Sequence, residues 1–205
     1  MRKTQITIEN IKLLGRPIFT TREISDMSGK SMSTVTQSLA YLSRHNVIKK
    51  VYRGVWTEIT NKLINPFMLV PHLFKLSRVY VSFLSALHMH GIIEQIPQSI
   101  TLASILHSKK IKTAIGTFVV HQISPKFFAG FDWYKGSESF LIAEPEKALA
   151  DCLYLFTRKK KQYGYFPELN LQKPFSVKKV KKWIKEIPDR KASISAMKKL
   201  YEILK

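Results

Sequence analysis

Four charged side chains near residue 147 form the group that most resembles a catalytic centre. They are Glu144, Glu146, Lys147 and Asp151, the composition of a nuclease carboxylate–lysine cluster. Pro145 fits the first turn of a helix, and the flanking carboxylates suit the positive end of the helix dipole. Glu146 and Asp151 would then lie five residues apart on one helix rather than on adjacent strands. We therefore interpret the group as a capped helix start and expect no catalysis there.

Neither the histidines nor the single cysteine has the spacing of a metal or nucleophile site. His88 and His90 are two residues apart, so on a helix they point about 200° from each other. The other histidines considered show no ligand spacing to that pair; they are His72, His107 and His121. Cys152 falls on an apolar helix face, which indicates a core residue. We expect no metal, no cofactor and no enzyme activity.

A second set of residues, between positions 30 and 53, has the chemistry to contact DNA. Short polar side chains can hydrogen-bond base edges in a major groove. The candidate base-reading residues are Ser33, Thr34, Thr36 and Gln37. The candidate phosphate contacts are Lys30, Arg44, Lys49, Lys50 and Arg53. No acidic residue lies between Lys30 and Arg53, so no carboxylate there would repel phosphate.

Two helices and a hairpin must position these side chains. Thr20 followed by Glu23 predicts a capping box that starts a helix, which carries Ile24 and Met27 inward and stops near Gly29. A second helix is predicted from Ser31, with an apolar stripe of residues 35, 39 and 42. Two helices joined by a tight turn with a glycine are typical of a helix-turn-helix.

A β-hairpin is predicted directly after the second helix. The apolar period changes from 3.6 to 2 after Asn46, and residues 47–52 and 55–59 favour strands. Arg53-Gly54 is a candidate two-residue turn. The sequence thus predicts a winged helix-turn-helix domain over residues 1–62, with a basic wing that meets the DNA backbone.

Charge and composition set the broad class. The chain has 205 residues, of which 34 are Lys or Arg and 14 are Asp or Glu, a net charge of +20. Residues 1–62 carry +7, residues 63–157 carry +2 and residues 158–205 carry +11. Such a surplus predicts attraction to a polyanion. No apolar run is long enough to span a membrane, no apolar signal segment is evident, and one cysteine excludes a disulfide framework, so we expect a cytoplasmic protein.

Residues 63–205 are predicted to form a second domain of α+β type. A helix over residues 80–90 ends at Gly91, and residues 99–105 and 116–123 favour strands, with a further short strand between residues 127 and 134. Strands and helices do not alternate strictly, which disfavours a doubly wound sheet. The whole chain is therefore expected to be α+β, with basic helices over residues 158–205.

These last residues present a second basic surface. Its candidate residues are Arg158, Lys159, Lys160, Lys161, Lys178, Lys179 and Lys182. One interpretation is a phosphate-contacting surface that adds affinity without sequence information. The other is an ordinary solvated face, and the sequence leaves both open.

Several segments, in order, resemble AbiEi-type antitoxins of type IV toxin–antitoxin systems. Residues 17–20, 33–35 and 52–56 resemble the winged-helix half of that family. Tyr80 to Gly91 is similar to its helix with a Tyr-Val-Ser…Ala-Leu…His-Gly pattern. Ala143 to Asp151 is similar to its Ala-x-Pro-Glu-Lys-Ala-Leu-x-Asp segment.

The resemblance implies a transcriptional repressor that binds inverted repeats in double-stranded DNA of its own promoter. It implies a nucleotidyltransferase-like toxin, AbiEii, as the genetic partner, and a monomer or weak dimer that pairs on DNA. Two alternatives stay open: an RNA- or tRNA-binding protective protein, and an orphan winged-helix regulator with no toxin partner. An enzyme such as a nuclease is the third and least favoured hypothesis.

Overall fold

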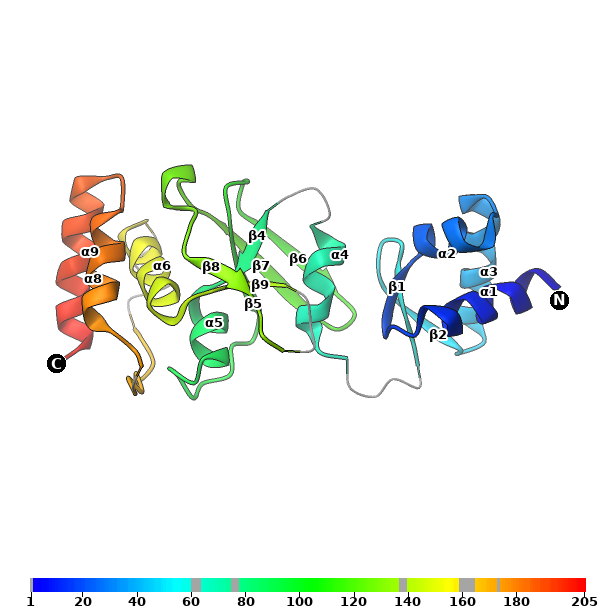
Figure 1. The fold of residues 1–205 in the computed structure, drawn as a ribbon, viewed down its shortest axis with the longest axis horizontal. Helices are drawn as coiled ribbons and strands as arrows, with labels where there is room; N and C mark the ends of the chain where they lie inside the picture. The colour runs from blue at the N-terminus through cyan, green and yellow to red at the C-terminus, as the bar shows by residue number, and fades with distance from the viewer. Residues whose placement is uncertain (1, 60–63, 75–77, 137–139, 159–164, 173) are drawn as a thin grey trace. The chain divides into compact units, whose positions relative to one another are not determined.

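The computed structural model describes residues 2–59, 64–74, 78–136, 140–158, 165–172 and 174–205 (Figure 1). The chain divides into two compact units. The first contains residues 1–75 with 112–116, and the second contains residues 76–111 with 117–205. Helices and two sheets make up the described residues, so the expected α+β class is confirmed.

Three helices enclose the core of the first unit: α1 (Arg2–Leu14), α2 (Thr21–Ser28) and α3 (Met32–Arg44). Their inward side chains, with Phe19, Ile48 and Trp56 from the strands, form one apolar cluster. The expected apolar stripe of α3 is confirmed, because Val35 and Leu39 are fully buried and Leu42 is 2 % exposed. Ile24 is buried as expected, but Met27 is 44 % exposed, so its predicted inward position is wrong.

A small antiparallel sheet closes the first unit. Its strands are β1 (Ile18–Thr20), β2 (Ile48–Tyr52) and β3 (Val55–Glu58), in the order β1-β3-β2. The register pairs Phe19 with Trp56 and Lys50 with Trp56, and it shifts between Lys50 and Tyr52. The predicted hairpin and its Arg53-Gly54 turn are therefore confirmed. A short 3-10 helix, η1 (Pro66–Leu69), and α4 (Val70–Leu73) follow.

Among the described residues, the second sheet has six strands in the order β6-β7-β5-β4-β9-β8. Their bounds are β4 (Val79–Val81), β5 (Ile100–Ser104), β6 (Lys109–Thr113), β7 (Gly116–Gln122), β8 (Phe131–Trp133) and β9 (Leu141–Ala143). The pairs β5–β7 and β4–β9 are parallel, whereas β4–β5 and β8–β9 are antiparallel.

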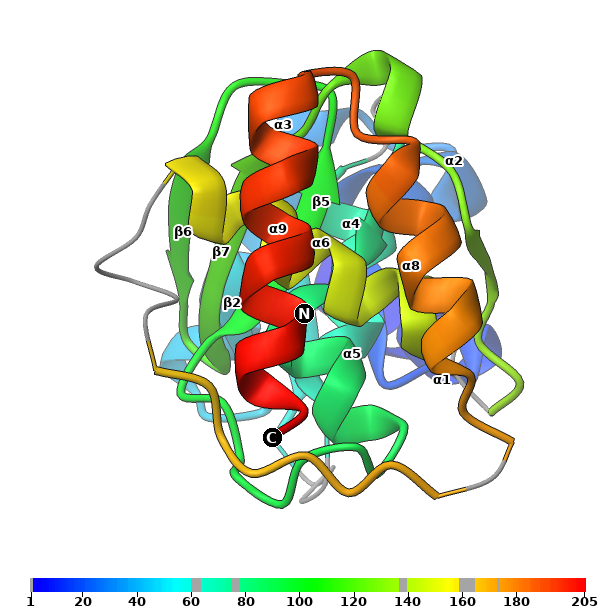
Figure 2. The same ribbon diagram turned by 90° about the vertical axis from the view of Figure 1, so that its left-hand side faces the viewer.

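Helices cover this sheet in layers. The described helical segments are α5 (Phe83–Met89), the 3-10 turn η2 (Pro125–Phe127), α6 (Pro145–Arg158), α8 (Val177–Lys185) and α9 (Arg190–Ile203). The long helix α6 is buried along residues 146–155 and packs against α5, α8 and α9. Figure 2 shows α8 and α9 side by side as the outermost layer, in front of α6.

The structure corrects the helix predicted over residues 80–90. Tyr80 and Val81 belong to β4, in the middle of the sheet, and the helix begins only at Phe83. Residues 79–81 are extended rather than helical because their backbone pairs with both β5 and β9. Within the described residues, no helix combines the length and apolar character needed to cross a bilayer.

Candidate nucleic-acid interface

Helix α3 presents a polar, accessible face opposite its buried stripe. Ser33, Thr36, Gln37 and Arg44 are all exposed, at the spacing of one side of a helix. Thr34, by contrast, is half-buried rather than exposed, and its hydroxyl lies 3.0 Å from the Ser31 hydroxyl. The structure therefore places three of the four predicted base-reading residues on one open face and ties the fourth to the helix cap.

The start of α3 is set by local hydrogen bonds. Ser31 is the N-cap, and its hydroxyl accepts a bond of 3.3 Å from the Thr34 amide. The turn before it contains Gly29, whose φ of +63° is a conformation that glycine adopts without steric cost. The Ser25 hydroxyl donates to the Lys30 carbonyl at 2.6 Å, which closes the α2–α3 turn. Lys30 itself is half-buried beside the start of α3.

The opposite end of α3 turns sharply into β2. Asn46 adopts a φ of +56°, the Val47 amide donates to the Leu42 carbonyl at 3.0 Å, and the Asn46 amide donates to the Ser43 carbonyl at 3.2 Å. This pattern is a Schellman motif, which satisfies the last carbonyls of a helix and reverses the chain. The first strand of the hairpin consequently begins at Ile48, four residues after the last residue of α3.

The hairpin holds its basic residues outward. Lys49, Lys50 and Arg53 are exposed, and the Lys50 ammonium lies 5.6 Å from the centroid of the buried Trp56 ring. The turn is fastened to the start of α2, because the Thr21 amide donates to the Gly54 carbonyl at 2.9 Å. All the predicted wing cations thus sit on a hairpin of fixed orientation.

Glu23, an acidic residue in the first turn of α2, is engaged by the capping box of that helix. Its carboxylate accepts bonds from the Thr20 amide at 2.7 Å and the Thr20 hydroxyl at 2.8 Å. Burial acts to raise the pKa of Glu23, but these bonds together with the charges of His72 and Arg16 hold the pKa below its ordinary value of 4.5. The predicted capping box is confirmed.

The second basic surface is only partly described. Lys159, Lys160 and Lys161 lie outside the described residues. Arg158 is exposed at the end of α6, and Lys178 and Lys182 are exposed on α8.

Lys179 has a different role from its basic neighbours on α8. Its ammonium lies 2.7 Å from a carboxylate oxygen of Glu144 and 3.6 Å from one of Glu146. The hydrogen bond to Glu144 raises the pKa of Lys179. Lys179 therefore joins α8 to the start of α6.

A buried polar network in the second unit was not anticipated from the sequence. Lys147 and Asp151 form an ion pair with both side chains fully buried. The same carboxylate accepts bonds from the Ser82 hydroxyl at 2.6 Å and the Tyr80 hydroxyl at 3.0 Å. The Lys147 ammonium also lies 3.1 Å from the Tyr80 oxygen, so the network links α6 to β4 and to the start of α5.

Aromatic rings enclose the ammonium of this network. The Lys147 nitrogen lies 3.8 Å from the centroid of the Phe127 ring and 5.6 Å from that of Trp183. Burial lowers the pKa of Lys147 and raises the pKa of Asp151, each against the effect of its partner. Because these groups are buried and already bonded to one another, the arrangement supports a structural role in joining α6 to the sheet.

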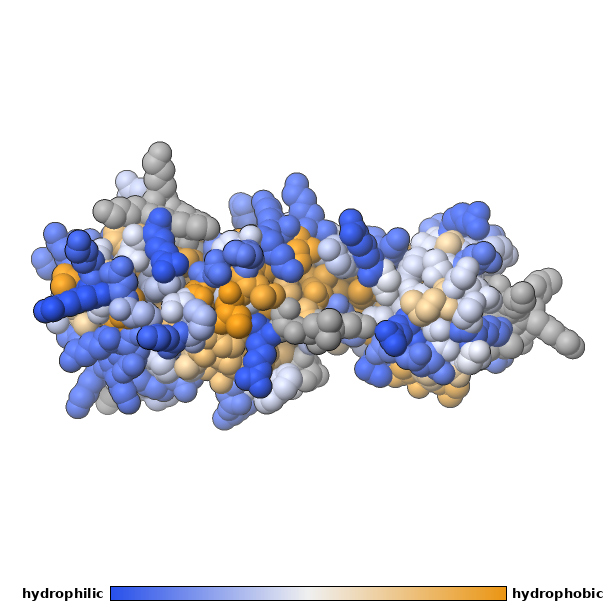
Figure 3. Space-filling model, turned by 90° about the horizontal axis from the view of Figure 1, so that it is seen from above, coloured by the Kyte–Doolittle hydropathy of each residue, from blue (hydrophilic) through white to orange (hydrophobic). Residues whose placement is uncertain are grey.

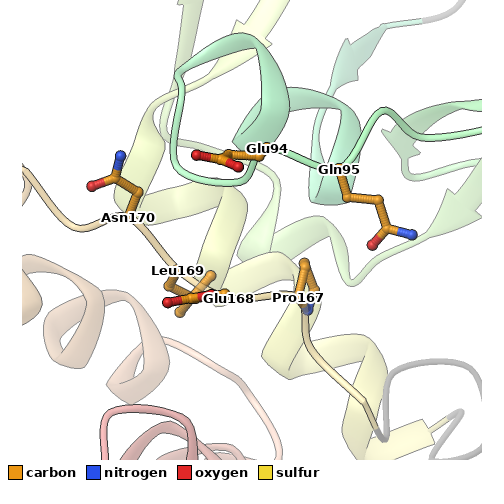
Figure 4. A pocket seen from close by; sticks show the side chains of 6 residues that line it. All are labelled: Glu94, Gln95, Pro167, Glu168, Leu169 and Asn170. Carbon is orange, nitrogen blue, oxygen red and sulfur yellow. The ribbon is translucent and has the colours of Figure 1, made fainter.

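Two hollows of the second unit are lined by polar side chains. One of about 420 Å³ is lined by Glu94, Gln95, Pro167, Glu168, Leu169 and Asn170 (Figure 4). Its polar side chains are the carboxylates of Glu94 and Glu168 and the amides of Gln95 and Asn170. A second hollow, of about 710 Å³, contains Glu144, Glu146 and Lys179, which are paired with each other. Among the described residues, no group of three His, Cys, Asp or Glu is placed to hold a metal ion.

Comparison with known proteins corrects the family suggested by the sequence motifs. No curated protein matches the chain. The expected resemblance to AbiEi-type antitoxins is wrong, and the antitoxin role and toxin partner that it alone implied are not supported. One of the motifs that suggested this family, Ala143 to Asp151, has a structural explanation instead. It includes the start of α6 and the buried Lys147–Asp151 pair. The family model that does match describes a Firmicute plasmid replication protein (RepL), and it covers residues 1–71, so the first unit of this chain is similar to that family.

Proposed function

We propose that the first unit is a winged helix-turn-helix that binds double-stranded DNA in a sequence-specific manner, and that the chain is a DNA-binding regulator. In this proposal α3 is the recognition helix and the β2–β3 hairpin is the wing. The observation that carries it is the exposed face of α3, where Ser33, Thr36 and Gln37 stand opposite a fully buried stripe.

Dimensions and charge support this assignment. Helix α3 has 13 residues and is therefore about 20 Å long, and the major groove, about 12 Å wide, admits such a helix. Its first turn has no acidic residue. Arg44 at its far end, with Lys49, Lys50 and Arg53 after it, would contact the phosphates that flank the groove.

The similarity of residues 1–71 to a plasmid replication family supports action on DNA. This similarity adds plasmid replication to transcription as a process that the protein could regulate. The proposal includes both possibilities. We assign no enzymatic activity, because the carboxylate–lysine group that most resembles a catalytic centre is engaged within the protein. Lys147 and Asp151 are buried, Glu146 accepts from the Ser176 amide, and Glu144 pairs with Lys179.

Selection of bound sequences from a random duplex library, followed by affinity measurements on the selected site, tests the proposal. Arg53→Ala should weaken binding to all duplexes, because it removes a phosphate contact. Gln37→Ala should cost about 1–3 kcal/mol on the selected site and relax the preference at one base pair. Arg78→Ala and Gln98→Ala are matched controls, since both side chains are exposed on the second unit.

Failure to enrich any sequence would refute sequence-specific binding. Enrichment that survives Gln37→Ala and Arg53→Ala unchanged would show that the reading surface lies elsewhere in the chain.

A further inference from the structure

The outer face of the α8–α9 pair carries two rows of lysines. On α8 the row is Lys178, Lys181 and Lys185, at the i, i+3 and i+7 positions of one helix side. On α9 the row is Lys191 and Lys198, and Lys205 continues the same seven-residue spacing two residues after the helix ends. All are exposed except Lys181, which is half-buried. Figure 3 shows hydrophilic residues crowded at this end of the second unit.

Large apolar side chains interrupt the lysine row of α9. Ile194 is 63 % exposed and Tyr201 is 50 % exposed, and they alternate with the lysines at three- and four-residue intervals. The helix buries Ala196 and Leu200 on its other side, so Ile194 and Tyr201 are not needed for the core. Seven residues of helix rise about 10.5 Å, which separates the two apolar groups along the face.

Tyr201 connects the two lysine rows. The Lys181 ammonium of α8 lies 4.6 Å from the centroid of the Tyr201 ring, which covers one side of the ring and holds it in place. Half of the residue remains accessible. The contact makes the two rows one continuous surface, which we call the lysine–tyrosine face: Lys178, Lys181, Lys185, Ile194, Lys198 and Tyr201.

We propose that the lysine–tyrosine face binds single-stranded nucleic acid. Proteins that bind single strands combine a row of cations along the backbone with aromatic rings on which bases stack, and this combination tolerates any sequence. Lysines suit this role because each is a flexible point charge rather than a directional fork. The activity is additional to duplex binding by the first unit.

The apolar residues distinguish a single strand from the other partners of a basic surface. The backbone of a duplex offers phosphates and sugars and hides the faces of its bases, so exposed Ile194 and Tyr201 would gain nothing there. A second copy of the chain would place lysines against lysines, which repel. Unstacked bases supply both the negative charge and the flat apolar faces that this surface fits.

The test measures binding of the full chain to labelled oligo(dT) of about 20 nucleotides, and to its duplex with oligo(dA), over a range of salt concentrations. Tyr201→Ala should weaken oligo(dT) binding about 5- to 150-fold, and Tyr201→Phe should retain it. Tyr165→Ala is the matched control, because Tyr165 is 99 % exposed and lies outside the face. The triple change Lys178→Gln, Lys185→Gln and Lys198→Gln should reduce the salt slope by about 2.

The proposal requires that the same variants bind the selected duplex site within about twofold of the wild type, because α3 and the wing carry that activity in the proposed function. It is overturned if Tyr201→Ala binds oligo(dT) like the wild type. It is also overturned if the lysine changes weaken duplex and single strand equally, which would indicate a simple duplex backbone contact. If Tyr201→Ala and the triple lysine variant lose binding to phosphatidylserine vesicles but retain oligo(dT) binding, the face would be assigned to membranes instead.

Discussion

The buried Lys147–Asp151 pair supports a quantitative prediction about the second unit. Lys147→Met leaves the Asp151 carboxylate fully buried with only the Tyr80 and Ser82 hydroxyls as donors. Removing one partner of a buried pair costs about 3–5 kcal/mol of unfolding free energy, because the remaining charge loses its compensation. Asp151→Asn should cost a similar amount by stranding the Lys147 ammonium.

The two variants should respond to pH in opposite directions. Burial raises the pKa of Asp151, and loss of Lys147 raises it further, so the penalty in Lys147→Met is full above that pKa and relieved as pH falls through it. Burial lowers the pKa of Lys147, and loss of Asp151 lowers it further. The penalty in Asp151→Asn is therefore full below that pKa and relieved as pH rises through it.

Hydrogen exchange of α6 peptides, with urea unfolding followed by tryptophan fluorescence, gives the free energies for this unit. A two-unit chain need not unfold in one step, so the local measurement is the primary one. The double variant Lys147→Met, Asp151→Leu should recover most of the loss, because no buried charge remains. Single variants that lose less than about 1 kcal/mol, or a double variant that loses the sum of the two, would refute the structural role.

Two further predictions concern the cap of α2 and a glycine beside the buried pair. Glu23→Gln should lower stability at neutral pH. The pKa of Glu23 is lowered in the folded protein, so its stabilisation is fully present above the ordinary value of 4.5, and the difference from wild type should disappear as pH falls through the lowered pKa. Thermal melts over a pH series from neutral into acid measure this. Gly130→Ala should lower the free energy of unfolding in urea by about 2–4 kcal/mol, because a Cβ there would lie 2.5 Å from the Trp183 ring and Gly130 has a φ of +75°. An unchanged urea midpoint would show that the segment can relax to accommodate the methyl group.

Local signals in the first unit were sufficient to predict α2, α3 and the hairpin. Thr20 with Glu23, Ser31 as an N-cap, and Arg53-Gly54 each specify a start or a turn through bonds within about four residues, and the structure contains all three. The exposed face of α3 followed from the position of its buried stripe. Met27 was misplaced because an eight-residue helix leaves the edge of its apolar side poorly defined.

The central strands of the second unit could not be predicted in the same way. β4 and β9 have three residues each, too few for an alternating pattern, yet they pair with each other in the middle of the sheet. Tyr80 and Val81 run directly into an apolar helix, and Ser82, the N-cap of α5, was not recognised as the start of that helix. The strand exists because of partners far along the chain.

The buried pair shows why sequence reasoning undervalued the charged group on α6. Lys147 and Asp151, four residues apart, have the spacing of an ordinary surface ion pair on a helix. Their burial depends on Tyr80 and Ser82, which are 67 to 71 residues distant, and on the rings of Phe127 and Trp183. A charge motif on one helix therefore has a meaning that only tertiary contacts supply. The same residues would suggest a catalytic centre if they were open to solvent, and here they anchor α6 to the sheet.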